Sequence, residues 1–176
     1  LTGVWIHHNY IHHNQATGSG YGVYVNANSI DHTASAIVEG NRFDYCRHVI
    51  VGSRGRSSYT FRYNYLGANC TNTQIDVHGQ NAGGDYLDKT SSGEYIYCAG
   101  ENVKIYNNTS VCTTNPFVGI RGIPYSTGSV SVHNNWTYTT ATQEWQLSSD
   151  RPKVRTINEQ MGYINHLTRF HLLPGV

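Results

Sequence analysis

An acid and an imidazole lie two residues apart in the stretch QIDVHG, residues 74–79. Successive side chains of a β-strand point to opposite faces, so Asp76 and His78 would share one outward face while Ile75 and Val77 face a core. A carboxylate can orient or charge-stabilise an imidazole, and histidine titrates near neutral pH. Asp76 and His78 are therefore our first catalytic candidates, and the alternative is a solvated strand face with a local hydrogen bond.

A related short strand, VGIR, ends in a third catalytic candidate, Arg121. If the two strands stack, Arg121 would lie beside His78. In an elimination at a uronate, Arg121 would neutralise the substrate carboxylate and His78 would take the C5 proton. A tyrosine, Tyr106 or Tyr125, would supply the acid.

Glycoside hydrolysis is the alternative chemistry for the same strands, and it requires two carboxylates. Asp76 would be one of them. The second could come from the acids of the long segment that follows, which are Asp85, Asp88 and Glu94. Substrate-binding candidates are the arginines and tyrosines near these strands, namely Arg54, Arg56, Arg62, Tyr106 and Tyr125.

A repeated sequence pattern indicates the structural elements that position these residues. The pattern apolar-x-apolar-x-x-Asn occurs as VWIHHN, AIVEGN, YTFRYN, VKIYNN and VSVHNN, which end at Asn9, Asn41, Asn64, Asn108 and Asn135. Each unit carries a second short strand that ends in or near glycine. Such a pattern is typical of a solenoid with stacked coils, and we expect the asparagines to lie at a corner, tolerate a left-handed conformation and form a hydrogen-bonded ladder. Alternation along each first strand turns Val4 and its equivalents inward, and Trp5, Ile37 and their equivalents outward. The pattern therefore also predicts two outward columns, one from Trp5 to Ser131 and one from His7 to His133.

The repeat, from roughly Val4 to Leu147, resembles the right-handed parallel β-helix proteins of the pectate-lyase-like superfamily. The resemblance implies an all-β fold, a right-handed parallel β-helix of about five or six coils. Residues 1–147 would form the coils, with a long insertion at 80–100, and residues 148–176 would form a C-terminal tail or cap.

Two local segments extend this resemblance. Asp76-Val77-His78 is similar to the Asp-Pro-His element of β-helical mannuronan C5-epimerases and related lyases, whose Asp and His belong to the active site. Val77 stands where that family has proline. The segment VWIHH is similar to the Trp-Ile-Asp-His segment of pectate lyases, but His7 replaces the acid that helps to hold calcium there.

Metal and cofactor predictions are few. The histidines of HHNYIHHN, residues 7–14, could indicate a transition-metal site, but only some of them can share a face across the Asn9 corner, so no metal ligand is predicted. The cysteines lack paired zinc spacing. Calcium is the one cofactor that the acids of the insertion could hold, although their spacing matches no recognised calcium loop.

The cysteines and asparagines indicate an extracellular or cell-surface protein. Cys46 and Cys70 could bridge adjacent coils, and Cys98 and Cys112 could close the insertion, but the sequence does not decide the pairing. Glycosylation sequons begin at Asn69, Asn107, Asn108 and Asn135.

The composition limits the kinds of partner that we expect this protein to bind. Charged residues make up 13% of the chain and the net charge is +1, so we expect no nucleic-acid partner, and no apolar stretch reaches the length of a membrane span. The leading hypothesis is a secreted enzyme that acts on a polysaccharide by elimination or hydrolysis. The rival hypothesis is a non-catalytic adhesin or structural protein that assembles with itself through the ends of the β-helix.

Overall fold

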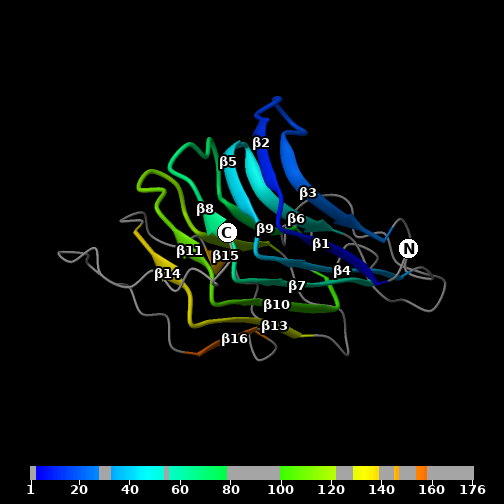
Figure 1. The fold of residues 1–176 in the computed structure, drawn as a ribbon. Coiled ribbons are helices and arrows are strands. Elements are labelled where there is room, and N and C mark those ends of the chain that lie inside the picture. The colour runs from blue at the N-terminus through cyan, green and yellow to red at the C-terminus, as the bar shows by residue number, and fades with distance from the viewer. Residues whose placement is uncertain are drawn as a thin grey trace.

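The computed structural model of the chain describes residues 3–27, 33–53, 56–78, 100–121, 129–138, 145–146 and 154–157. These residues form strands, turns and bends, with no helix among them (Figure 1). It follows that none of these residues belongs to a helix long and apolar enough to span a membrane. The predicted all-β class is confirmed for this part of the chain.

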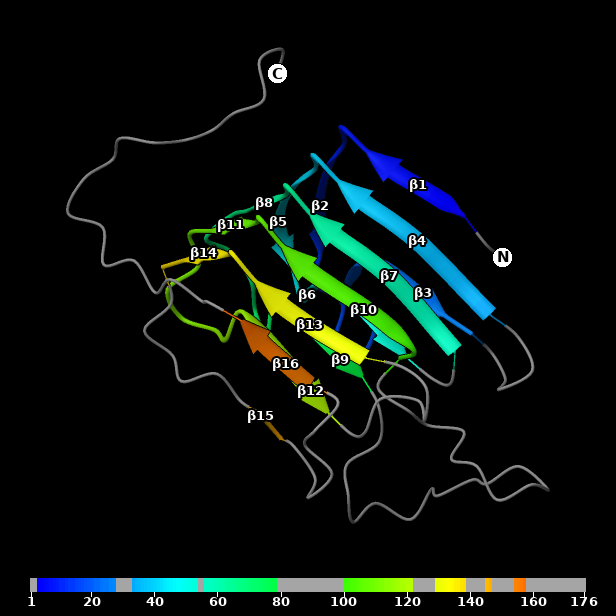
Figure 2. The ribbon, with the colours of Figure 1, turned by 90° about the horizontal axis from the view of Figure 1, so that it is seen from below.

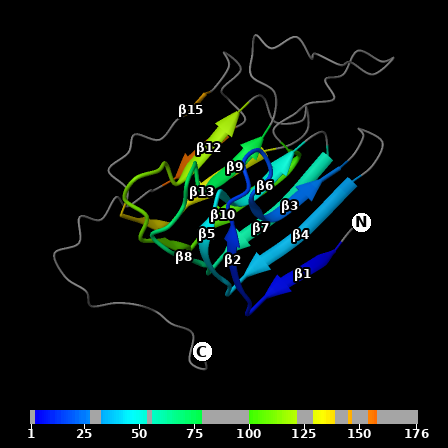
Figure 3. The ribbon, with the colours of Figure 1, turned by 90° about the horizontal axis from the view of Figure 1, so that it is seen from above.

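The strands lie in three sheets in which every pair is parallel. The first sheet runs in the order β1 (Val4–His7), β4 (Thr33–Glu39), β7 (Arg56–Arg62), β10 (Asn102–Tyr106), β13 (Ser129–His133) and β16 (Val154–Ile157), as Figure 2 shows. The second sheet contains β2 (Tyr10–Asn14), β5 (Arg42–Cys46), β8 (Tyr65–Leu66), β11 (Thr109–Ser110) and β14 (Trp136–Thr137). The third contains β3 (Tyr21–Asn26), β6 (His48–Ser53), β9 (Ile75–His78), β12 (Val118–Arg121) and β15 (Trp145–Gln146), seen beside the first sheet in Figure 3.

Each strand pairs with the strand three places later in the chain, so the chain visits the first, second and third sheets in turn. This order is that of an all-β parallel solenoid. Strand β16 continues the first sheet beyond Leu147, the predicted end of the coils. The insertion at 80–100, apart from Gly100, and the tail at 148–176, apart from β16, lie outside the described residues.

The register of the first sheet confirms both predicted outward columns. Trp5 lies opposite Ile37, and the column continues through Thr60, Lys104 and Ser131. The second column runs through His7, Glu39, Arg62, Tyr106 and His133. Alternate residues turn inward, because side chains alternate across a strand.

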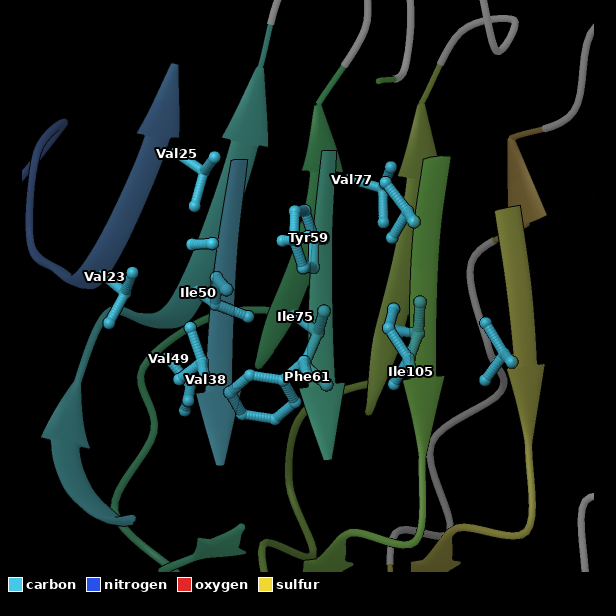
Figure 4. Close-up of a cluster of buried hydrophobic side chains, with 14 of the residues drawn as sticks. Val23, Val25, Val38, Val49, Ile50, Tyr59, Phe61, Ile75, Val77 and Ile105 are labelled. Carbon is cyan, nitrogen blue, oxygen red and sulfur yellow. The ribbon is translucent and has the colours of Figure 1, made fainter. Parts of the chain in front are cut away.

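The interior between the sheets is filled by stacked apolar side chains. Val38, Phe61 and Ile105 of the first sheet face Ile50 and Ile75 of the third, and all five are fully buried (Figure 4). Burying a side chain of this size stabilises the fold by about 1.5–3 kcal/mol. The rows of inward residues therefore hold the strands in register.

The predicted asparagine ladder is present at the corner between the first and second sheets. The backbone N–H and the amide Nδ2 of Asn41 both donate to Oδ1 of Asn64, at 3.0 and 3.1 Å. The same pair of bonds joins Asn9 to Asn41, Asn64 to Asn108 and Asn108 to Asn135. From Asn41 onward, these asparagines are at most 3% exposed.

The left-handed residue of this corner is not the ladder asparagine, so that part of the prediction was wrong. Positive φ occurs one residue earlier, at His8, Gly40, Tyr63, Asn107 and Asn134, with φ between 54° and 62°. The turn to the second sheet is made there, which leaves the following asparagine free to point inward and bond along the stack. The corner therefore needs two adjacent residues with different tasks.

Gly52 leaves space for the ring of Tyr59 to pack against the third sheet. A Cβ at Gly52 would clash with the Tyr59 ring, whose atom Cδ1 would lie 3.0 Å away and whose Cε1 would lie closer still. Tyr59 is 2% exposed, so its ring has little space to retreat. We predict that Gly52→Ala lowers the free energy of unfolding by about 1–3 kcal/mol in urea denaturation.

The matched control is the same change in a Tyr59→Val background. With the ring removed, the added methyl group should cost much less. An equal cost in both backgrounds would contradict the contact.

Candidate functional site

The third sheet carries the predicted catalytic residues. Asp76 lies opposite Gly119 and His78 opposite Arg121, as expected from stacking β9 on β12. Stacking the second strands of the repeat predicts Val49 beside Asp76 and Val51 beside His78, and this prediction was wrong by two residues: Val51 is opposite Asp76, and Ser53 is opposite His78. A shift of two residues keeps every side chain on the same face, so strand alternation alone cannot distinguish these registers. The side chains of His78 and Arg121 lie outside the described part of the structure.

Asp76 is buried, which corrects the prediction that it lies on a solvent-facing column. Its exposed fraction is 2%, and its neighbour Val51 is equally buried. Val51 is absent from the main apolar cluster that contains Ile75 and Val77. Asp76 is thus removed from water on the face of the third sheet that is turned away from the central core.

His48 is a member of this site that the sequence analysis missed. Its Nε2 lies 3.8 Å from Oδ2 of Asp76, and both side chains are 3% exposed. Its Nδ1 lies 2.5 Å from the carbonyl oxygen of Thr73. The ring of Tyr21 lies beside the imidazole, with centroids 5.7 Å apart.

Strand alternation does not indicate His48, because the alternation is irregular at the start of β6. The N–H groups of Val49 and Ile50 both point to the carbonyl of Gln74, at 2.7 and 3.4 Å. Both residues belong to the apolar core, so two consecutive side chains turn inward at this point. The alternation therefore breaks between His48 and the rest of its strand, in the manner of a β-bulge.

The hydrogen bond to Thr73 determines the protonation of His48. A carbonyl oxygen only accepts, so Nδ1 must carry a proton. Nε2 is then the nitrogen that can gain or lose a proton, and it faces the Asp76 carboxyl group. A second proton on His48 would make an imidazolium beside a carboxylate, and in this buried place the attraction is only weakly screened.

Tyr59 places a buried phenol close enough to Asp76 for the carboxylate charge to act on it. Its hydroxyl group is buried and has no hydrogen-bond partner in the part of the chain that the structure describes. Burial, and after it the negative charge of Asp76, raises the pKa of Tyr59 well above its usual range. The group therefore remains a neutral phenol, and an unpaired buried hydroxyl costs stability.

Tyr59→Phe should consequently stabilise the protein by about 1 kcal/mol, because it removes the unsatisfied hydroxyl and keeps the ring. Chemical denaturation of the variant and the parent would measure the difference. Tyr63→Phe is the control, since Tyr63 is 48% exposed and its hydroxyl can bond to water. A destabilised Tyr59→Phe would show that the hydroxyl has a partner.

The described substrate-binding candidates, Arg56, Arg62 and Tyr106, lie in the first sheet, whereas Asp76 lies in the third. On the outer face of the first sheet, Arg62 donates from Nε to Glu39 at 2.5 Å and from Nη1 to the Tyr106 hydroxyl at 3.0 Å. Arg56 pairs with Glu101 at 3.3 Å. Arg54 and Tyr125, like Asp85, Asp88 and Glu94 of the insertion, lie outside the described residues.

The described cysteines are free thiols, which corrects the predicted bridge between Cys46 and Cys70. Burial raises the pKa of Cys70 to about 12 and also raises the pKa of Cys46. The Cys70 thiol lies 3.0 Å from the carbonyl oxygen of Asn72. Cys112 is also free and buried, and Cys98 lies outside the described residues.

The asparagine ladder also excludes two of the four predicted glycosylation sites. Asn108 and Asn135 are 1% and 3% exposed, and each Nδ2 donates to a buried backbone carbonyl. A glycan on these amides would displace the ladder bonds, so these two predicted sites do not fit the folded chain. Asn69 and Asn107 are not in the ladder, and Asn69 is exposed.

Within the described ranges, no group of three or more His, Cys, Asp or Glu side chains is arranged to hold a metal ion. The acids proposed for calcium lie in the insertion, outside these ranges. No protein-family model, curated protein or solved structure matches the chain.

Proposed function

We propose that this protein is a secreted or surface-exposed β-solenoid that acts on a polysaccharide, by elimination at a uronate or by hydrolysis, at the third sheet. The observation that carries the proposal is the buried His48–Asp76 pair, in which Asp76 belongs to β9, the strand whose His78 lies opposite Arg121 of β12. The finer assignment, a right-handed parallel β-helix of the pectate-lyase-like kind with about five or six coils, is part of the same proposal.

The buried pair is not needed by the fold. Removing an ionised carboxylate from water costs several kcal/mol, even when it faces a partner. The residues opposite Asp76 in the adjacent strands are Val51 and Gly119, which fill the same position without a charge. Buried ionisable groups that the fold does not require are concentrated at functional sites.

The roles follow from the register. In the elimination, His78 takes the C5 proton of the uronate while Arg121 holds its carboxylate. The electrons of the C–H bond form the C4–C5 double bond, the C4–O bond breaks, and an acid returns a proton to the leaving oxygen. Asp76, held by His48, positions β9 and supplies negative charge that stabilises a protonated His78.

The rival function is a non-catalytic adhesin or self-assembling structural protein. Exposed aromatic side chains favour it, since Trp5, Tyr10 and Tyr24 are 50–58% exposed. Aromatic rings of this kind are common at protein interfaces. Self-assembly would make the sedimentation coefficient depend on protein concentration, whereas a soluble enzyme would turn over glycan as a monomer.

The deciding experiment is a screen on uronate-containing and neutral polysaccharides, which reads the ultraviolet absorbance of unsaturated products and the formation of reducing ends. His78→Ala is run beside His133→Ala, a histidine on the first sheet. We expect loss of activity only for His78→Ala. Activity unchanged by that substitution would refute the site, and no activity on any glycan would favour the structural role.

A further inference from the structure

The segment HHNYIHHN forms two imidazole pairs on the outer surface. His7 ends β1 and His8 makes the corner, and their Nδ1 atoms are 2.8 Å apart. His12 and His13 repeat this in β2, with Nδ1 atoms 2.6 Å apart. In each pair the two imidazole rings therefore turn toward one another.

Each pair is held by its neighbours. The His7 ring stacks on Trp5 with centroids 3.9 Å apart, and the His13 ring stacks on Tyr45 at 4.6 Å. The second histidine of each pair, His8 or His13, has positive φ, 55° or 61°. This backbone turn directs two consecutive side chains toward one point, although neighbours in a regular strand face opposite ways.

The fold does not require histidine at these positions. In the units that follow, the places of His7 and His8 are taken by Glu39 and Gly40, and those of His12 and His13 by Asp44 and Tyr45. The ladder and the left-handed corner form in those units without an imidazole. The four histidines therefore remain unexplained by the solenoid and by the proposed enzyme site.

We propose that each pair is a surface site for Cu(II), bound through the two Nδ1 atoms in cis positions of a square plane. Two nitrogen ligands at about 2.0 Å from a metal and at right angles to each other lie about 2.8 Å apart. Tetrahedral Zn(II) with the same bond lengths needs about 3.3 Å between them. The separation of 2.8 Å in the first pair equals the square-planar value and that of 2.6 Å in the second is shorter, and both are the separations of the hydrogen bond that now joins each pair.

Cu(II) can replace the hydrogen bond within each pair without a net gain or loss of protons, because the imidazole tautomers can change. The present contact joins one Nδ1–H donor to one Nδ1 acceptor. When both imidazoles carry their proton on Nε2, both Nδ1 lone pairs are free to bind the metal. Water fills the remaining positions, because no third side-chain ligand joins either pair in the described structure.

The experiment is a titration of the untagged chain with copper(II) chloride, followed by electron paramagnetic resonance and isothermal calorimetry. We expect two equivalents of Cu(II) per chain with a tetragonal, nitrogen-coupled signal. His8→Asn and His13→Tyr should each remove one equivalent, and the double variant should remove both. These replacements copy residues at corresponding corners, Asn107 and Tyr45, so they suit the local backbone.

His133→Ala is the matched control, since His133 is a single imidazole stacked on Tyr106 at 5.0 Å. It should leave the two equivalents unchanged. Unchanged stoichiometry in the folded double variant, as judged by circular dichroism, would overturn the proposal. Zn(II) binding as tight as Cu(II) binding would overturn the square-planar assignment.

Discussion

Asn108→Ala is expected to lower the free energy of unfolding by about 3–5 kcal/mol, because several buried groups lose their partners at about 1–3 kcal/mol each. The Asn108 amide donates to the carbonyls of Phe61 and Tyr106 and to Oδ1 of Asn135. Its own Oδ1 accepts from the backbone N–H and the amide of Asn64. Alanine can replace none of these bonds, and water cannot reach a residue that is 1% exposed.

Urea denaturation followed by circular dichroism measures this loss. The control is Asn107→Gly, at the adjacent left-handed position with φ of 54°, where glycine fits the backbone at little cost. We expect a change of well under about 1 kcal/mol for that variant. A similar small change for Asn108→Ala would show that the ladder does not hold the sheets together.

The second large effect concerns the buried pair of the third sheet. In a preparation active on a glycan, Asp76→Asn should reduce kcat about 10²–10⁴-fold, the usual contribution of acid–base catalysis. Asparagine keeps the size of the side chain but removes the negative charge that faces His48 across 3.8 Å. His48→Gln should reduce kcat in the same range, because it leaves the carboxylate without its imidazole.

A double-mutant cycle tests whether the two residues act as a unit. The double variant should lose little more activity than either single variant, since the interaction is already broken. Asp44→Asn is the control for loss of a carboxylate elsewhere, because Asp44 lies on the second sheet and bonds to Asn69 and Tyr45. Additive losses for Asp76 and His48 would contradict a coupled pair.

Much of the architecture could be predicted from residue types and spacing. The apolar alternation in units such as YTFRYN determines which residues face the core, and the asparagine at the end of each unit determines which residues stack. The register confirms the columns through Trp5 and His7 across the first sheet. These features are local, because strand periodicity and a repeated corner residue are properties of consecutive positions.

The candidate site was predicted only in part. Asp76 was singled out because the sister strands were expected to carry Val49 and Gly119 in its place, but its burial was not foreseen. His48 was missed because two inward residues, Val49 and Ile50, interrupt the alternation of β6. The pairing of His7 with His8 was likewise hidden, since it depends on a positive φ at the corner.

The all-β class, the parallel stacking of the units and the asparagine ladder could be predicted from residue types alone, because each follows from a repeated local pattern. The tertiary structure was needed to show that β6 is shifted by two residues against β9, that Asp76 is removed from water, and that His48 and Tyr59 lie near it. Those features depend on contacts between residues far apart in the chain. A shift of two residues in register leaves the sequence pattern intact, yet it changes which side chains meet.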